Sequence, residues 1–390
     1  MDFFHRMGSH HRIAPQDAVY CETPDAFSKG NKLTVLNNGR EAYPAMMAAI
    51  AQARKTIHLE TYILRSDRIG WEFAKLLGEK ARTAVQVRLI YDSMGSMELS
   101  RGYLQYLRNH GISILEYHPV APWRRRWGWG RRDHRKILVV DGHVGFTGGI
   151  NIADDYAPLE EGGGGWRDIH VRIEGPGAYE LDRIFRETWF RETGRWFAID
   201  GGHDGEAGPS FVMATANQEF LHRHRIRRAY RYAVRRARRY VSIANPYFIP
   251  DRAIRRVLFR AGGRGVRVRV LVPGHSDVPA VSYASRHRYE DLLRHGVRIF
   301  EWPGPVLHSK TVVVDGIWSA VGSYNMDHRS WLHNLEVNLH VLDRDFAQKL
   351  QEGFERDILA SREINLPQWR RRPWEEKLLE RLFYFARYWL

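Results

Sequence analysis

An internal repeat is the feature that most constrains how this chain can fold. Four blocks recur in the same order: residues 53–67, 85–93, 109–119 and 133–151 resemble residues 237–251, 266–274, 294–305 and 307–325. Repetition in a fixed order is the mark of duplicated structural units. The sequence therefore predicts two copies of one unit, and the length of 390 residues fits two domains.

Each copy has the pattern of an α/β unit. The predicted strands are 56–63, 85–91, 112–117, 136–141 and 144–147 in the first copy, and 241–249, 266–272, 297–302, 310–315 and 318–321 in the second. The predicted helices between them are 70–83, 99–109, 252–262 and 283–295. Asp141-Gly142 and Asp315-Gly316 are typical hairpin turns. Strands that alternate with helices favour a mostly parallel or mixed sheet flanked by helices.

Composition places the domain boundaries. A Gly-, Asp- and Pro-rich stretch at 199–210 predicts a junction between the copies. We expect an N-terminal tail at 1–29, a first domain at 30–200, a second domain at 211–365 and an amphipathic C-terminal helix at 366–390.

Both copies carry the pattern H-x-K-x4-D-x6-G-[G/S]-x-N. Its members are His134, Lys136, Asp141, Gly148, Gly149 and Asn151 in the first copy, and His308, Lys310, Asp315, Gly322, Ser323 and Asn325 in the second. Alternate residues of a strand face the same side, so each histidine is expected to project together with its lysine. A lysine beside each histidine opposes metal binding, so no metal site is expected.

This duplicated pattern is similar to the paired HKD motifs of the phospholipase D superfamily. Within it, the blocks at 59–64, 166–176, 245–250 and 308–315 resemble bacterial cardiolipin synthases that lack N-terminal spanning helices. The resemblance implies two tandem phospholipase-D-like units with pseudo-two-fold symmetry and an active site between them. It also implies a phosphatidyltransferase that makes cardiolipin from phosphatidylglycerol through a covalent phosphohistidine, without a cofactor. A hydrolytic phospholipase D, a nuclease and a non-catalytic lipid-binding scaffold are the alternatives.

The roles that follow are predictions. His134, Lys136, His308 and Lys310 are expected to be catalytic, with His134 favoured as the nucleophile and His308 as the acid and base. Asp141 and Asp315 complete the two motifs, but their place at a strand end favours a structural role. The predicted substrate contacts are Asn151, Asn325, Ser323, Gly149, Glu60 and Asn245. By resemblance, Asp168 would orient His134, and Glu336 would orient His308.

Charge indicates the kind of partner. Sixty Lys and Arg against forty-five Asp and Glu leave a net charge of +15, which favours polyanions such as nucleic acid, an anionic bilayer or phosphorylated substrates. The stretch 120–133 interleaves arginines with tryptophans, residue types that suit phosphates and the membrane interface. The residues predicted to bind the membrane are Trp123, Arg124, Arg125, Arg126, Trp127 and Trp129. Base stacking by the same residue types is the alternative.

Residues 373–390 predict an amphipathic helix. Leu378, Leu379, Leu382 and Phe383 fall on one face, followed there by Ala386, Trp389 and Leu390. This face could lie in a membrane interface, pack on the domains or pair between two subunits.

No apolar run reaches the ~18–20 residues of a spanning helix, and the first residues lack the apolar stretch of a signal peptide. Together with the resemblance to bacterial cardiolipin synthases, this implies a peripheral protein of the bacterial cytoplasmic membrane. Its expected partners are phosphatidylglycerol, cardiolipin and the membrane surface, with no nucleic acid and with a homodimer as an option.

Overall fold

The computed structural model describes residues 13–121, 123, 128, 130–198, 205–217 and 224–388. The first unit comprises β1 (Ser28–Asn37), α2 (Asn38–Gln52), β2 (Thr56–Thr61), α3 (Arg68–Arg82), β3 (Gln86–Asp92), α4 (Arg101–Asn109), β4 (Ser113–Tyr117), β5 (Ile137–Val140), β6 (Val144–Gly148), β7 (Ile169–Glu174) and α5 (Pro176–Thr193). Two short 3-10 helices, η2 (Asp154–Tyr156) and η3 (Leu159–Glu161), lie between β6 and β7.

The second unit repeats this order. It comprises β8 (Ser210–Asn217), α6 (Arg225–Arg236), β9 (Tyr240–Ala244), α7 (Arg252–Gly263), β10 (Arg267–Pro273), α8 (Pro279–Arg286), α9 (Tyr289–Arg294), β11 (Val297–Trp302), β12 (Thr311–Val314), β13 (Trp318–Gly322), α10 (His328–Leu332), β14 (Glu336–Leu342) and α11 (Arg344–Leu359). It ends with β15 (Arg362–Glu363), α12 (Leu366–Arg370) and α13 (Trp374–Phe385).

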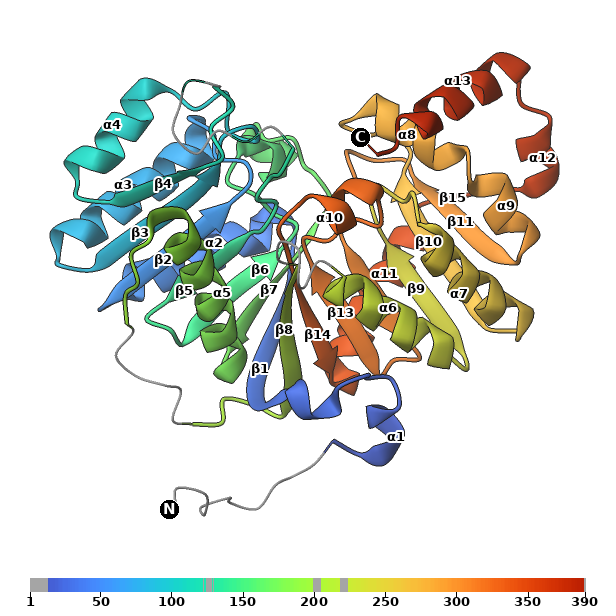
Figure 1. Cartoon of the computed structure of the whole chain (residues 1–390), viewed down its shortest axis with the longest axis horizontal. Helices are drawn as coiled ribbons and strands as arrows, with labels where there is room; N and C mark the ends of the chain where they lie inside the picture. The colour runs from blue at the N-terminus through green and yellow to red at the C-terminus, as the bar shows by residue number, and fades with distance from the viewer. Residues whose placement is uncertain are drawn as a thin grey trace.

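The described strands of both units form one 15-stranded sheet with helices on both faces (Figure 1). Its order is β15-β11-β10-β9-β12-β13-β14-β8-β1-β7-β6-β5-β2-β3-β4. Apart from β15, equivalent strands of the two units follow in the same order when read inward from either edge, so a pseudo-two-fold axis relates the two units. The two predicted units are therefore present, and they share a sheet because β1 and β8 pair near their first residues.

Both predicted hairpins are present, and the aspartate that follows each motif strand fixes its position. Asp141 and Asp315 have φ of 52° and 56°, and the glycine after each is also left-handed, as the tight turn requires. The Asp141 carboxylate accepts hydrogen bonds from the backbone of Arg54, Lys55 and Thr56 at 2.7–2.8 Å. The Asp315 carboxylate accepts equivalent bonds from residues 238–240. Each aspartate thus holds the start of the neighbouring antiparallel strand, β2 or β9, and lies at the opposite end of its own strand from the histidine. Neither Asp141 nor Asp315 therefore lies beside the histidine of its motif, where a catalytic group would be needed.

The central strands β1, β7, β8 and β14 were not predicted, although they join the two units. Helix α5 of the first unit also contacts β8, and α11 of the second unit also contacts β1. The apolar core under these two helices therefore combines residues of both halves, from Ile137 to Leu350.

Two segments differ from their expectations. Residues 13–29 are not a tail: they form α1 (Pro15–Ala18) and a 3-10 helix (Pro24–Ala26), and Tyr20, Cys21 and Phe27 are buried in the core of the second unit, while residues 1–12 lie outside the described ranges. The Tyr20 hydroxyl also donates to Asp315 at 2.7 Å. The predicted helix 283–295 is two helices, α8 and α9, separated at residues 287–288.

Candidate active site

The two motif segments cross from one half of the molecule to the other. The backbone N–H of His134 donates to Leu335 at 3.0 Å, and Leu335 donates back to Arg132 at 2.9 Å. In the symmetry-related place, His308 donates to Arg167 at 2.7 Å, and Arg167 donates to Val306 at 2.9 Å. Each histidine therefore lies beside the start of the carboxylate-bearing strand of the opposite unit.

This crossing exchanges the predicted histidine–carboxylate pairs. Nδ1 of His134 lies 3.1 Å from Glu336, and Nδ1 of His308 lies 2.8 Å from Asp168. The expectation that Asp168 orients His134 and Glu336 orients His308 was wrong. Spacing along the chain cannot reveal a pairing that depends on how the units dock.

The two lysines hold their own histidines in place. Nζ of Lys136 donates to the backbone oxygen of His134 at 2.6 Å, and Nζ of Lys310 donates to that of His308 at 2.5 Å. Both lysines are buried, so burial is the main cause that lowers the pKa of Lys136 to about 7 and that of Lys310 to about 8. Lys310 also repels Lys136. A bound anion would relieve both effects, which makes the two lysines a candidate anion site.

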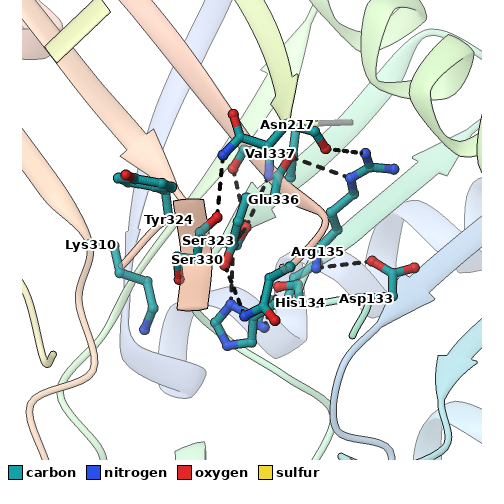
Figure 2. Close-up of polar contacts among 12 residues, drawn as sticks. Asp133, His134, Arg135, Asn217, Lys310, Ser323, Tyr324, Ser330, Glu336 and Val337 are labelled. Atoms are coloured by element: carbon teal, nitrogen blue, oxygen red, sulfur yellow. Dashed lines mark hydrogen bonds and ion pairs between the residues drawn. The ribbon is translucent and has the colours of Figure 1, made fainter. Parts of the chain in front are cut away.

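The residues around the two histidine-orienting carboxylates differ between the halves. Ser323 donates to Glu336, and its oxygen accepts the Val337 backbone N–H at 3.0 Å (Figure 2). In the first half, Gly149 replaces the serine, and the shorter Asp168 accepts the equivalent N–H, from Ile169, at 2.7 Å. A Cβ at Gly149 would lie 2.3 Å from both Asp168 carboxylate oxygens. Serine with glutamate and glycine with aspartate are thus alternative ways to fill one space. Neither Ser323 nor Gly149 offers the substrate contact that the sequence predicted.

The two histidines also differ electrostatically. Burial and the charge of Lys136 lower the pKa of His134 well below its usual value. Burial and Lys310 also lower the pKa of His308, but Asp168 and Asp277 oppose this shift. Burial raises the pKa of Glu336 to about 7, so this carboxylate carries its charge only part of the time at neutral pH.

The two motif asparagines are not equivalent. Asn151 donates to the Tyr156 hydroxyl at 2.6 Å and accepts the Ile63 backbone N–H at 3.0 Å, so both ends of its amide are occupied. The side-chain oxygen of Asn325 is buried without a partner among the described residues. Of the two motif asparagines, only Asn325 therefore has an amide oxygen that is available to contact a substrate.

Glu60 and Asn245 do not face the histidines. Glu60 is fully buried 3.7 Å from Arg135, whose side chain points to the opposite side of the strand from His134 and Lys136. Asn245 accepts the Met326 backbone N–H at 3.0 Å and donates to Tyr324. Asn245 therefore supports the loop after β13, and Glu60 belongs to a buried charge cluster. The prediction that either binds substrate was wrong.

Aromatic side chains surround the histidines. The ring of Tyr62 lies 4.9 Å from that of His134, and Trp166 lies 5.5 Å from His308. The hydroxyl of Tyr156 is 3.3 Å from Nδ1 of His308. Tyr156 has no counterpart in the pattern that defines the motif, so sequence reasoning missed it. The same is true of Asp277, which accepts a 2.6 Å hydrogen bond from Tyr247 and acts electrostatically on His308.

Only part of the predicted membrane-binding stretch can be placed. Trp123 is 85% exposed. Arg124, Arg125, Arg126, Trp127 and Trp129 lie outside the described residues. Within the described ranges, no helix has both the length and the apolar character needed to cross a bilayer.

Comparison with known proteins connects this site to a family. A protein-family model, described as the phospholipase D-like domain of cardiolipin synthase, matches residues 46–189 and 230–358. A cardiolipin synthase of Geobacillus kaustophilus is 36% identical over 90% of this chain and 71% of its own length. Cardiolipin synthase A of Pseudomonas syringae is 36% identical over 86% of this chain and 70% of its own length.

Solved structures show the same fold at low identity. Phosphatidylserine synthase of Haemophilus influenzae superposes with a TM-score of 0.67 at 14% identity, covering 92% of this chain and 95% of its own. Polyphosphate kinase of Porphyromonas gingivalis superposes with a TM-score of 0.56 at 15% identity, covering 83% of this chain and 46% of its own. The sequence relatives and the matched domain are decisive: the chain belongs to the cardiolipin synthase family of phospholipase D-like phosphatidyltransferases.

Proposed function

We propose that this protein makes cardiolipin from two molecules of phosphatidylglycerol through a covalent phosphohistidine. The observation that carries the proposal is the pair of buried histidines, each with its own lysine and a carboxylate from the opposite half. Two imidazoles beside one anion site can divide nucleophilic attack from proton transfer. The sequence relatives named cardiolipin synthases supply the substrate class.

In the first step, Nε2 of His134 attacks the phosphorus of one phosphatidylglycerol. The bond from phosphorus to the terminal glycerol oxygen breaks, and His308 gives that oxygen a proton. Lys136 and Lys310 stabilise the additional charge on the non-bridging oxygens in the transition state. Free glycerol leaves, and the phosphatidyl group stays on His134.

In the second step, the now neutral His308 takes a proton from the terminal hydroxyl of a second phosphatidylglycerol. That oxygen attacks phosphorus, and the bond from phosphorus to His134 breaks. Cardiolipin is released, and both histidines return to their starting protonation states.

The assignment of roles rests on the differing surroundings of the histidines. A nucleophile must begin neutral, and His134 has the more strongly lowered pKa of the two. An acid must carry a proton, and Asp168 and Asp277 support a charged His308. Glu336, with its pKa near 7, gives His134 less support as a cation.

We further propose that the protein acts peripherally on the bacterial cytoplasmic membrane. Its substrates would be bilayer lipids, and its net charge of +15 favours an anionic surface.

The test is mass spectrometry of lipids after incubation of the purified protein with phosphatidylglycerol vesicles. Cardiolipin and glycerol in equal amounts, absent with His134→Ala and with His308→Ala, would support the proposal. Phosphatidic acid as the sole product would instead assign a hydrolase.

A further inference from the structure

Helix α13 presents its apolar side chains outward. Trp374, Leu378, Leu382 and Phe385 follow one another at helical spacing and are 69%, 47%, 56% and 67% exposed. In this apolar stripe, Leu378 and Leu382 belong to the face for which the sequence left membrane, packing and subunit contact open, whereas Phe383 of that face packs on α8.

The opposite side of α13 holds the helix to the second unit. Glu380 and Tyr384 are buried, and Glu380 pairs with Arg372. Phe383 stacks on Tyr283 of α8 with ring centroids 5.5 Å apart. The helix is therefore fixed in an orientation that keeps its apolar stripe in contact with the surroundings.

A strongly basic pocket of about 380 Å³ opens beside the end of this helix. It lies between the start of α7, the link from α8 to α9, α10 and the residues after α13. We call it the arginine pocket, because six arginines line it: Arg227, Arg252, Arg255, Arg256, Arg288 and Arg387. Tyr388 lines it as well, is 45% exposed and follows Phe385 by three residues, so the apolar stripe ends at the pocket.

Most of this positive charge is not neutralised. Asp251 binds Arg227 through two hydrogen bonds of 2.7 and 2.8 Å, and Asp291 pairs with Arg255 at 3.0 Å. Arg288 and Arg387 contact tyrosine and backbone oxygens, which carry no charge. Arg252 and Arg256 have no hydrogen bond or ion pair with any residue that the structure describes. Four cations thus converge on the pocket without a carboxylate.

The pocket residues also hold buried donors without acceptors. Among the described residues, no acceptor meets the Nε–H of Arg255, Arg288 or Arg387, or the indole N–H of Trp331. His328 is only 6% exposed, and its Nδ1 has no partner either. Buried polar groups are normally hydrogen-bonded. A set of unpaired donors beside uncompensated arginines suits a ligand rich in anionic oxygens.

The residues at the equivalent place in the first half are less basic. Asp67 and Asp251 both cap the helix that follows, which aligns α3 with α7. Arg255 and Arg256 then correspond to Trp71 and Glu72, and Arg68, the counterpart of Arg252, is paired with Glu72 and Glu161. The arginine pocket is therefore a feature of the second half and does not follow from the repeat.

We propose that the arginine pocket binds the headgroup phosphate of an anionic phospholipid, while the apolar stripe of α13 lies among the lipids of the same bilayer. This second, non-catalytic lipid site would orient the active site at the membrane. It rests on the proposed function only in placing the protein at a lipid surface. An apolar stripe that leads into a pocket of phosphate-binding side chains matches an acyl chain joined to a phosphate.

Flotation of the protein with vesicles tests the site without turnover. His134→Ala protein is used throughout so that no lipid is consumed, and vesicles of phosphatidylglycerol are compared with vesicles of phosphatidylcholine. The test variant adds Arg252→Ala and Arg256→Ala, which remove two side chains without partners. The matched control adds Arg235→Ala and Arg260→Ala, which remove the same charge from the far ends of α6 and α7.

The pocket variant is expected to bind phosphatidylglycerol vesicles about thirtyfold more weakly, since each cation near an anionic surface contributes about fivefold. The control is expected to lose about threefold or less. Equal losses in both variants, or no loss in the pocket variant, would overturn the site. Because turnover plays no part, this outcome is independent of whether cardiolipin is made.

A second variant pair separates the lipid site from other occupants. Leu378→Ser with Leu382→Ser is expected to weaken flotation with both kinds of vesicle by about tenfold, because the stripe buries apolar area in either lipid. A change from dimer to monomer in these variants would reassign the stripe to a contact between subunits. Inorganic phosphate that binds the wild-type pocket as tightly as vesicles do would reassign the pocket to a soluble anion. Either result contradicts the proposal.

Discussion

The two halves of the molecule place the same histidine, lysine and asparagine at the same points of the sheet, but they surround them differently. His134 faces a glutamate of raised pKa, and that glutamate accepts a hydrogen bond from a serine. His308 has a close aspartate, the Tyr156 hydroxyl and the field of Asp277. Duplication supplied two equal motifs, and changes around the motifs made one histidine more basic than the other. A tandem repeat can thus divide one reaction between two copies of the same residue.

The histidines test this division with the largest expected effect. Alanine at His134 or at His308 is expected to lower kcat on phosphatidylglycerol by at least about a thousandfold. A phosphodiester with a nitrophenol leaving group needs no proton on departure, so it should restore nitrophenol release to His308→Ala but not to His134→Ala. Rescue of His134→Ala instead would reverse the two roles.

The second largest effect is expected for the two carboxylates that pair with a histidine of the opposite half. Asp168→Asn is expected to cost about a hundredfold or more in kcat, because it removes the charge that supports His308 as a cation. The nitrophenol substrate should rescue this variant too, since Asp168 acts through His308. Glu336→Gln should cost less, about tenfold, because Glu336 is already partly neutral at pH 7. If Asp168→Asn behaved like His134→Ala with both substrates, the crossed pairing would be contradicted.

A reciprocal exchange tests the packing difference between the halves. Gly149→Ser forces atoms onto the Asp168 carboxylate and should lower activity about tenfold or more by displacing it from His308. Ser323→Gly removes one hydrogen bond from Glu336 and should cost about fivefold. Steady-state kinetics with circular dichroism as a folding control measures both. Equal effects of the two substitutions would mean that the surroundings of Asp168 and Glu336 are interchangeable.

The pH profile tests the two lysines, which both halves share. The lysines bind an anion only when protonated, and in the free enzyme their pKa values are about 7 and about 8. As the pH rises through these values, both lysines lose their charge. Above neutral pH, each lysine should therefore lower kcat/KM by up to about tenfold for every pH unit. The lowered pKa of His134 keeps this nucleophile neutral over the same range. A rate that stays constant up to pH 9 would contradict a role for the lysines in anion binding.

The repeat made much of the outer sheet predictable, because β-branched strands and Asp-Gly turns recur in both copies. The central strands β1, β7, β8 and β14 escaped prediction because they lack strong turn signals and are defined by long-range pairing. The motif residues were predictable because duplication makes them conspicuous. The crossed pairs of His134 with Glu336 and His308 with Asp168 were not, since they depend on how the halves dock. For the same reason, burial of Tyr20 against the second half could not be read from its position in the chain.

The most direct test is to locate the covalent intermediate. The protein is mixed with phosphatidylglycerol, quenched with base within one turnover because phosphohistidine survives alkali, and digested for mass spectrometry. The account predicts a phosphatidyl adduct on the peptide that contains His134 and none on the peptide that contains His308. An adduct on His308 would contradict the division of roles, and an adduct on neither histidine would contradict the covalent mechanism.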